Sequence, residues 1–76
     1  MDKIVKAIPL ANYQVRISTR LGVEGIFDVK PYIKGAYFEQ LLDENYFNSV
    51  KNCGSSIAWP NEQDLSLGTI MFDLKY

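Results

Sequence analysis

The sequence predicts a small α+β fold: an antiparallel sheet, made of a three-stranded meander and a C-terminal hairpin or strand, with one or two short helices packed on one face. Two observations predict this class. Apolar and polar residues alternate through residues 12–21, which is typical of a strand with one buried face. After Pro31 the apolar spacing becomes helical. At 76 residues, the chain has room for a single domain, residues 1–76.

Three successive strands are predicted in the first part of the chain, over residues 4–10, 12–21 and 23–29. Pro9 cannot donate to a strand ladder, so the end of the first strand belongs at a sheet edge or a bulge. Gly22 marks the turn before the third strand. The inward side chains of the second strand are expected to be Tyr13, Val15, Ile17, Thr19 and Leu21.

The next segment predicts short helices. Pro31 suits a first helical turn, and the large apolar residues of 36–42 recur at helical spacing. Asp43 and Glu44 interrupt the apolar run and begin a second short turn with Tyr46 and Phe47. We expect this helical segment to cover the apolar face of the meander, since neither surface can stay exposed.

The remaining residues predict a hairpin, a turn and a last strand. Residues 50–53 and 56–59 flank a turn at Gly54. Leu65 and Leu67 are assigned to a turn or a short helical piece. Alternating apolar residues then predict a strand over 69–74, with Ile70, Phe72 and Leu74 on one face.

The composition disfavours an enzyme. The chain has no histidine and one cysteine, Cys53, which removes imidazole bases, most zinc sites and any internal disulfide. No glycine cluster matches a phosphate-binding loop, and the carboxylates are typical of caps and solvated turns. We therefore expect no catalytic residues, no metal and no cofactor.

Localisation and charge are the next expectations. The N-terminus lacks the continuous apolar core of a signal peptide, and no window approaches the roughly 20 apolar residues of a membrane span. We expect a cytoplasmic protein with no membrane partner. Six basic and three acidic residues give residues 1–34 a charge of +3, whereas two basic and six acidic residues give residues 35–76 a charge of −4.

A basic face is the first candidate interaction surface. Arg16 and Arg20 lie on the polar side of the 12–21 strand, and Lys6 can join them from the neighbouring strand. Such a face could contact phosphates. The sequence pI of about 5.2 favours a solvated sheet face instead.

Trp59 and Asp64 complete the candidate residues. Trp59 stands beside Pro60 at a predicted strand end, where a half-exposed indole could anchor a partner. The alternative, which we favour, is a structural plug, because a small core needs its largest side chain. Asp64 could cap the residues that follow it.

Several motifs resemble a small bacterial family, the domain of unknown function 2442. The match runs from about Ala7 to Leu67 and rests on the sequences FDVKPYI, IAWPN and DL, together with Phe38, Leu41, Asp43 and Phe47. Two departures stand out. Glu62 replaces the usual glycine after Trp-Pro-Asn, and residues 68–71 replace a more polar, aspartate-containing ending.

The resemblance implies a mixed fold with a small antiparallel sheet and short helices, similar to the N-terminal domain of certain bacterial helix-turn-helix proteins. This chain would be the stand-alone form. Family members tend to be encoded beside another small family, which looks like a toxin-antitoxin pairing. The resemblance carries over no enzymatic activity and no catalytic residue.

Three functions follow from these observations. The first is a non-enzymatic protein-interaction module that uses the open sheet face and the rim near Trp59, with a partner encoded by a neighbouring gene or a second copy of the chain. The alternative is an antitoxin-like or transcription-regulatory component that contacts nucleic acid through Arg16, Arg20 and Lys6. The third is a small-molecule sensor.

Overall fold

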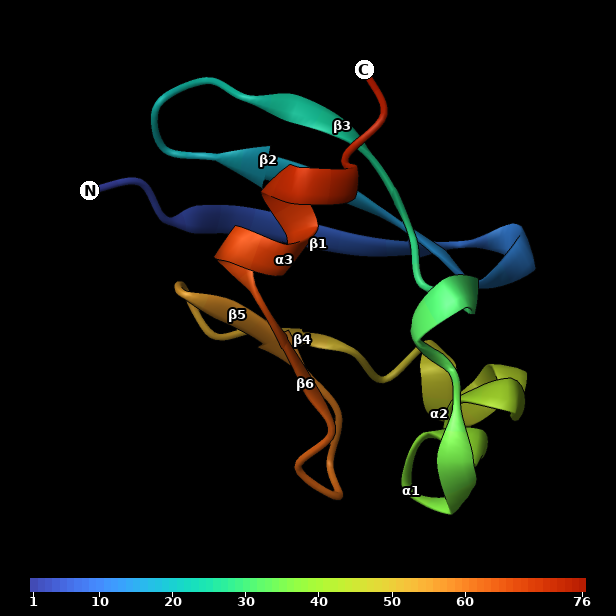
Figure 1. The fold of residues 1–76 in the computed structure, drawn as a ribbon. Coiled ribbons are helices and arrows are strands. Elements are labelled where there is room, and N and C mark those ends of the chain that lie inside the picture. Colours follow the sequence, from blue (N-terminus) through green and yellow to red (C-terminus); the bar gives the residue numbers. More distant parts are fainter.

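Two three-stranded antiparallel sheets build the fold, and the computed structural model describes all residues 1–76 (Figure 1). The first sheet has the order β1-β2-β3, formed by β1 (Ile4–Leu10), β2 (Gln14–Thr19) and β3 (Glu24–Asp28). This is the predicted meander. Pro9 lies in β1, which is an edge strand as its missing N–H requires.

β2 is shorter than predicted at both ends. A 3-10 turn, η1 (Ala11–Tyr13), precedes it, because Asn12 and Tyr13 adopt φ values of 62° and 59° and leave the extended conformation. At the other end, Gly22 adopts φ 94° in the turn to β3. Leu21 therefore lies in the turn, 69% exposed, and not on the inner face where the alternation placed it.

The helical segment is confirmed. It comprises η2 (Lys30–Tyr32), α1 (Gly35–Glu39), η3 (Gln40–Leu42) and α2 (Glu44–Phe47). Asp43 is the N-cap of α2, where its Oδ1 accepts hydrogen bonds from the backbone N–H groups of Asn45 at 2.9 Å and Tyr46 at 3.4 Å.

The helix that packs on the apolar face of the meander is not the one we expected. The segment of α1 and α2 lies at one end of the molecule (Figure 1), where the Tyr13 hydroxyl donates to the Leu42 carbonyl at 2.6 Å. A later helix, α3 (Leu67–Asp73), packs against β3. The fold class is therefore confirmed, with α3 as a helix on the inner face.

The second sheet contains the predicted hairpin and one strand that the sequence did not predict. Its order is β4-β5-β6, formed by β4 (Lys51–Asn52), β5 (Ser56–Ala58) and β6 (Asp64–Ser66). Gly54 takes φ 82° in the hairpin turn. Leu65 pairs with Ile57 in the ladder, so its assignment to a turn or helical piece was wrong.

The predicted strand over 69–74 was also wrong, because residues 69–73 belong to α3 and Leu74 is its C-cap. Ser66 caps this helix, since its Oγ accepts the N–H of Thr69 at 3.2 Å. Ile70 and Leu74 are buried, and their separation of four residues suits a helix face as well as a strand face. Phe72 decides between the two, because it is 87% exposed on the opposite side of the helix.

A single core lies between the two sheets and the helices. It contains Val15, Ile17 and Phe27 of the first sheet, Ile57 of the second and Ile70 of α3, each 0% exposed. Phe47 of α2 stacks at a tilt on Trp59, with ring centroids 5.8 Å apart. This core joins residues from both halves of the chain.

A buried glutamine fastens the β5–β6 loop to the helical segment. Gln63 is 1% exposed, accepts a hydrogen bond from the Tyr46 hydroxyl at 2.6 Å, and donates to the Tyr37 carbonyl at 2.9 Å. These bonds satisfy its amide, as burial requires. Beside it, Glu62 adopts φ 72°, a left-handed conformation that favours glycine.

Replacing Glu62 with glycine is expected to stabilise the protein by about 1 kcal/mol. The left-handed conformation costs a non-glycine residue roughly 1–2 kcal/mol, which exceeds the extra chain entropy that glycine loses on folding. Glu62 is exposed and its side chain makes no hydrogen bond that would be lost. Urea denaturation measures the change. The matched control, Glu39→Gly in α1, should destabilise, and a loss of stability in Glu62→Gly would contradict the argument.

Candidate functional site

The side of the first sheet that faces away from the core is left uncovered by the rest of the fold. Strand register sets its side chains in three rows across β1, β2 and β3. Lys6, Ser18 and Glu24 form one row, Ile8, Arg16 and Ile26 the next, and Leu10, Gln14 and Asp28 the third. We call these nine residues the outer face. None is buried, whereas Val15, Ile17 and Phe27 on the other side are fully enclosed.

The basic residues predicted from the sequence are brought together only in part. Lys6 and Arg16 occupy adjacent rows of the outer face and are both exposed. Arg20 lies beyond the end of β2, where its Nη2 donates to the Met1 carbonyl at 2.7 Å. Glu24 and Asp28 add carboxylates to the same face. The surface is therefore mixed in charge, and Arg20 is separate from it.

The two edges of this sheet differ. Ile26 of β3 exchanges two backbone hydrogen bonds with Lys75, at 2.8 and 2.9 Å, so the C-terminal residues cover that edge. In an antiparallel ladder, the backbone N–H and C=O groups of successive residues point to opposite sides of the strand. Since Ile26 bonds Lys75, its partner Arg16 bonds Ile8, and the backbone groups of Ala7 and Pro9 point away from β2. Beyond the bond from the Ile4 N–H to the Gly54 carbonyl, the β1 edge makes no strand pairing.

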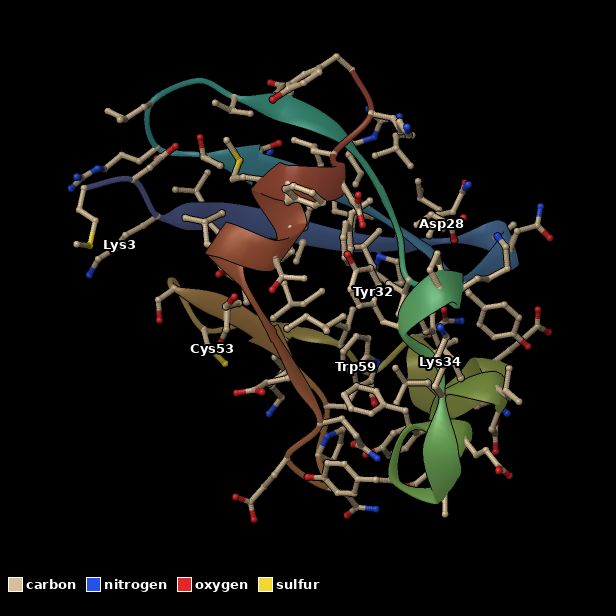
Figure 2. The ribbon with its side chains drawn as sticks, viewed as in Figure 1. Lys3, Asp28, Tyr32, Lys34, Cys53 and Trp59 are labelled. Atoms are coloured by element: carbon tan, nitrogen blue, oxygen red, sulfur yellow. The ribbon has the colours of Figure 1, made fainter.

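Trp59 is a core residue and not an exposed anchor. It is 3% exposed, and its Nε1 donates to the Phe47 carbonyl at 2.9 Å. Figure 2 shows it in the interior, between the second sheet and the helical segment. The structure thus agrees with a plug and removes the half-exposed indole from the interaction surface.

Asp64 does not cap a helix. It is the exposed first residue of β6, opposite Ala58, and Ser66 provides the cap of α3 instead. The sequence order Asp-Leu-Ser placed two capping residue types within three positions, and the strand pairing of Leu65 decides which one precedes the helix.

A polar pocket at one end of the sheet was not predicted from the sequence. It has a volume of about 430 Å³ and lies between η1 and α2. Its lining residues are Pro9, Leu10, Ala11, Asn12, Tyr13, Glu44, Asn45, Phe47 and Asn48. Glu44 and Asn48 are four residues apart in the sequence, and that spacing is the one signal that could have indicated a shared face.

Comparison with protein families agrees with the resemblance noted in the sequence. The profile of the family described as "Protein of unknown function (DUF2442)" matches residues 4–76. The chain belongs to the DUF2442 family. Searches of curated proteins and of solved structures each found no match.

Other chemistry-bearing groups in this DUF2442 chain are dispersed. No group of three or more histidine, cysteine, aspartate or glutamate side chains is placed to hold a metal ion. Cys53 is an exposed free thiol at the β4–β5 turn (Figure 2). No helix has the length and apolar character needed to cross a membrane.

Tyr32 and Asp73 form a titratable pair with a clear electrostatic effect. The Tyr32 hydroxyl donates a hydrogen bond to the Asp73 carboxylate, which raises the pKa of Tyr32, with burial as a further cause. A raised pKa favours the neutral phenol in the folded state. Its contribution to stability is therefore present below the ordinary tyrosine pKa and lost as pH rises through the folded value. The pair fastens η2 to the end of α3.

Proposed function

We propose that this DUF2442 chain is a protein-interaction module that docks its partner on the outer face. The observation that carries the proposal is the composition of that uncovered surface. Ile8 is 45% exposed, next to Lys6 along β1 and opposite Arg16 on β2, and the carboxylates of Glu24 and Asp28 lie on β3 across the sheet. A surface that combines apolar groups with both signs of charge matches the makeup of protein–protein interfaces.

The strands behind this surface support a docking role. Val15, Ile17 and Phe27 are enclosed by the core, so the backbone that presents the outer face is held in place before a partner arrives. A preorganised surface loses little conformational entropy on binding. Pro9 removes one donor from the β1 edge, which disfavours addition of a further strand and favours contact through the face.

A second candidate is contact with nucleic acid, because Lys6 and Arg16 lie close together on the uncovered face. Charge favours a protein partner over this alternative. Glu24 would face the phosphates, Asp28 is paired with Lys30 at 3.1 Å, and Arg20 is occupied by the Met1 carbonyl. The net charge of −1 also opposes attraction to a polyanion.

A photo-crosslinking residue at position 8 tests the proposal. We expect p-benzoylphenylalanine in place of Ile8 to give one stoichiometric protein adduct in cells of the source organism, and Arg16→Glu to reduce its yield. The control places the same residue at Phe72, which is 87% exposed on α3, behind the sheet.

Three outcomes would contradict a protein partner at this face. They are the absence of an adduct from position 8, an equal yield of the same adduct from position 72, and an adduct to nucleic acid. The last outcome favours the second candidate.

A further inference from the structure

The pocket between η1 and α2 has polar groups that the protein itself does not use. The side chains of Asn12, Asn45, Asn48 and Glu44 line it and make no hydrogen bond within the chain. Other asparagines are engaged: Asn61 Nδ2 donates to Gln40 Oε1 at 2.6 Å, and Asn52 Oδ1 accepts the Gly54 N–H at 2.8 Å. The four lining side chains are exposed to solvent, and the three asparagines of the chain whose side chains have no partner within it all line this pocket.

The backbone that forms this hollow is strained. Asn12 tolerates its φ of 62°, but Tyr13, at φ 59°, does not belong to the residue types that favour this region. The conformation is held by the Tyr13 hydroxyl bond to the Leu42 carbonyl and by the Val29 N–H, which donates to the Tyr13 carbonyl at 3.0 Å. Strain maintained in this way is characteristic of ligand sites.

The charge of the pocket is negative. Glu44 is the one residue of the lining that carries a charge at neutral pH. Lys30 contacts the rim of the pocket, since its Nζ donates to the Asn12 carbonyl at 2.8 Å. That ammonium group lies 3.1 Å from Asp28 Oδ1, which offsets its charge. A cationic ligand is therefore favoured.

We propose that this pocket binds a guanidinium group, the arginine side chain of the partner that docks on the outer face; the inference rests on the proposed function. A guanidinium offers five N–H donors in one plane, and the pocket offers a carboxylate and three amide oxygens. An ammonium group has three donors and keeps its water more strongly. Pro9 and Leu10 provide an apolar wall for the methylene stem.

The position of the pocket connects it to the outer face. Leu10 belongs to both, as a member of the third row and as a lining residue. Strand spacings give the outer face a flat extent of about 14 by 17 Å, or roughly 240 Å². A standard interface needs about 800 Å² from each partner. A partner on this face must therefore extend onto neighbouring surface, and the pocket lies at its border.

Titration with N-acetyl-arginine-methylamide, followed by NMR of the backbone and asparagine side-chain amides, tests the pocket. We expect saturable shifts at Asn12, Asn45 and Asn48. The uncharged citrulline analogue should bind about tenfold more weakly, because it cannot form a charge-assisted bond with Glu44. Glu44→Gln should weaken arginine binding by a similar factor, and the control Glu39→Gln, on the exposed surface of α1, should leave it unchanged.

Two results of the titration would overturn the proposal: shifts that do not saturate, and equal affinity for the citrulline analogue. Crosslinking from position 8 separates the two proposals. If a protein adduct forms and arginine does not bind, the proposed guanidinium site is wrong and the proposed protein-interaction function is retained. If arginine binds and Glu44→Gln lowers the adduct yield, the partner supplies the group. If arginine binds and no adduct forms, the partner assignment is wrong and the site takes a free guanidinium compound.

Discussion

Trp59→Ala is expected to destabilise the protein by about 3–5 kcal/mol. Trp59 is 3% exposed and packs on Phe47 at the junction of the second sheet and α2. Removal of a buried aromatic ring loses its transfer free energy and leaves a cavity. The Phe47 carbonyl also loses its donor from the indole Nε1. A chain of 76 residues has a total stability of about 4–11 kcal/mol, so much of the population should unfold.

Urea denaturation followed by circular dichroism measures this loss, and the dispersion of the proton NMR spectrum reports whether a folded state persists. Trp59→Phe is the matched control. It keeps a ring in the cavity but leaves the Phe47 carbonyl without its donor, so we expect a smaller loss of about 1–3 kcal/mol. If Trp59→Ala costs less than 1 kcal/mol, the indole is not the central residue of the core.

Local sequence patterns were sufficient to predict a strand or a helix start where its residues depend only on neighbours close in the chain. Alternation through residues 14–19 fixes which side chains of β2 are buried and placed Arg16 on the uncovered face. It placed Arg20 there as well, but that residue lies beyond the end of β2. Asp43 was recognisable as a helix start because its side chain caps the turn that follows. These inferences depend on neighbours within a few positions.

The C-terminal elements could not be predicted in this way. Ile70 and Leu74 satisfy the spacing of both a strand and a helix, and the Ser66 cap together with the β5–β6 pairing determines the outcome. Trp59 was ambiguous for a similar reason, since its burial depends on Phe47, twelve residues away in the chain. The pocket requires η1 and α2, which only the folded chain brings together.

Gly25 provides the second large effect, because its position in β3 leaves no room for a side chain. A Cβ atom there would lie 2.7 Å from the Lys75 carbonyl oxygen and 2.8 Å from Leu74 Cγ. The Lys75 carbonyl accepts the Ile26 N–H, so it cannot shift without breaking the pairing that holds the C-terminal residues on the sheet. Gly25→Ala is therefore expected to cost about 2–4 kcal/mol, from overpacking and the loss of these bonds.

Gly68→Ala in α3 is the control for this substitution. The added Cβ would meet its nearest atom, Ser66 Oγ, at 3.8 Å, an ordinary contact, and alanine favours the helix by about 1 kcal/mol. The two glycine-to-alanine variants should thus change stability in opposite directions. Hydrogen exchange at the amides of Ile26 and Lys75 should accelerate in Gly25→Ala alone, and equal stability of both variants would contradict the close approach.

Ile26 also belongs to the outer face, so release of the C-terminal residues would uncover the β3 edge beside the proposed docking surface. Gly25→Ala should therefore also lower the yield of the adduct from position 8.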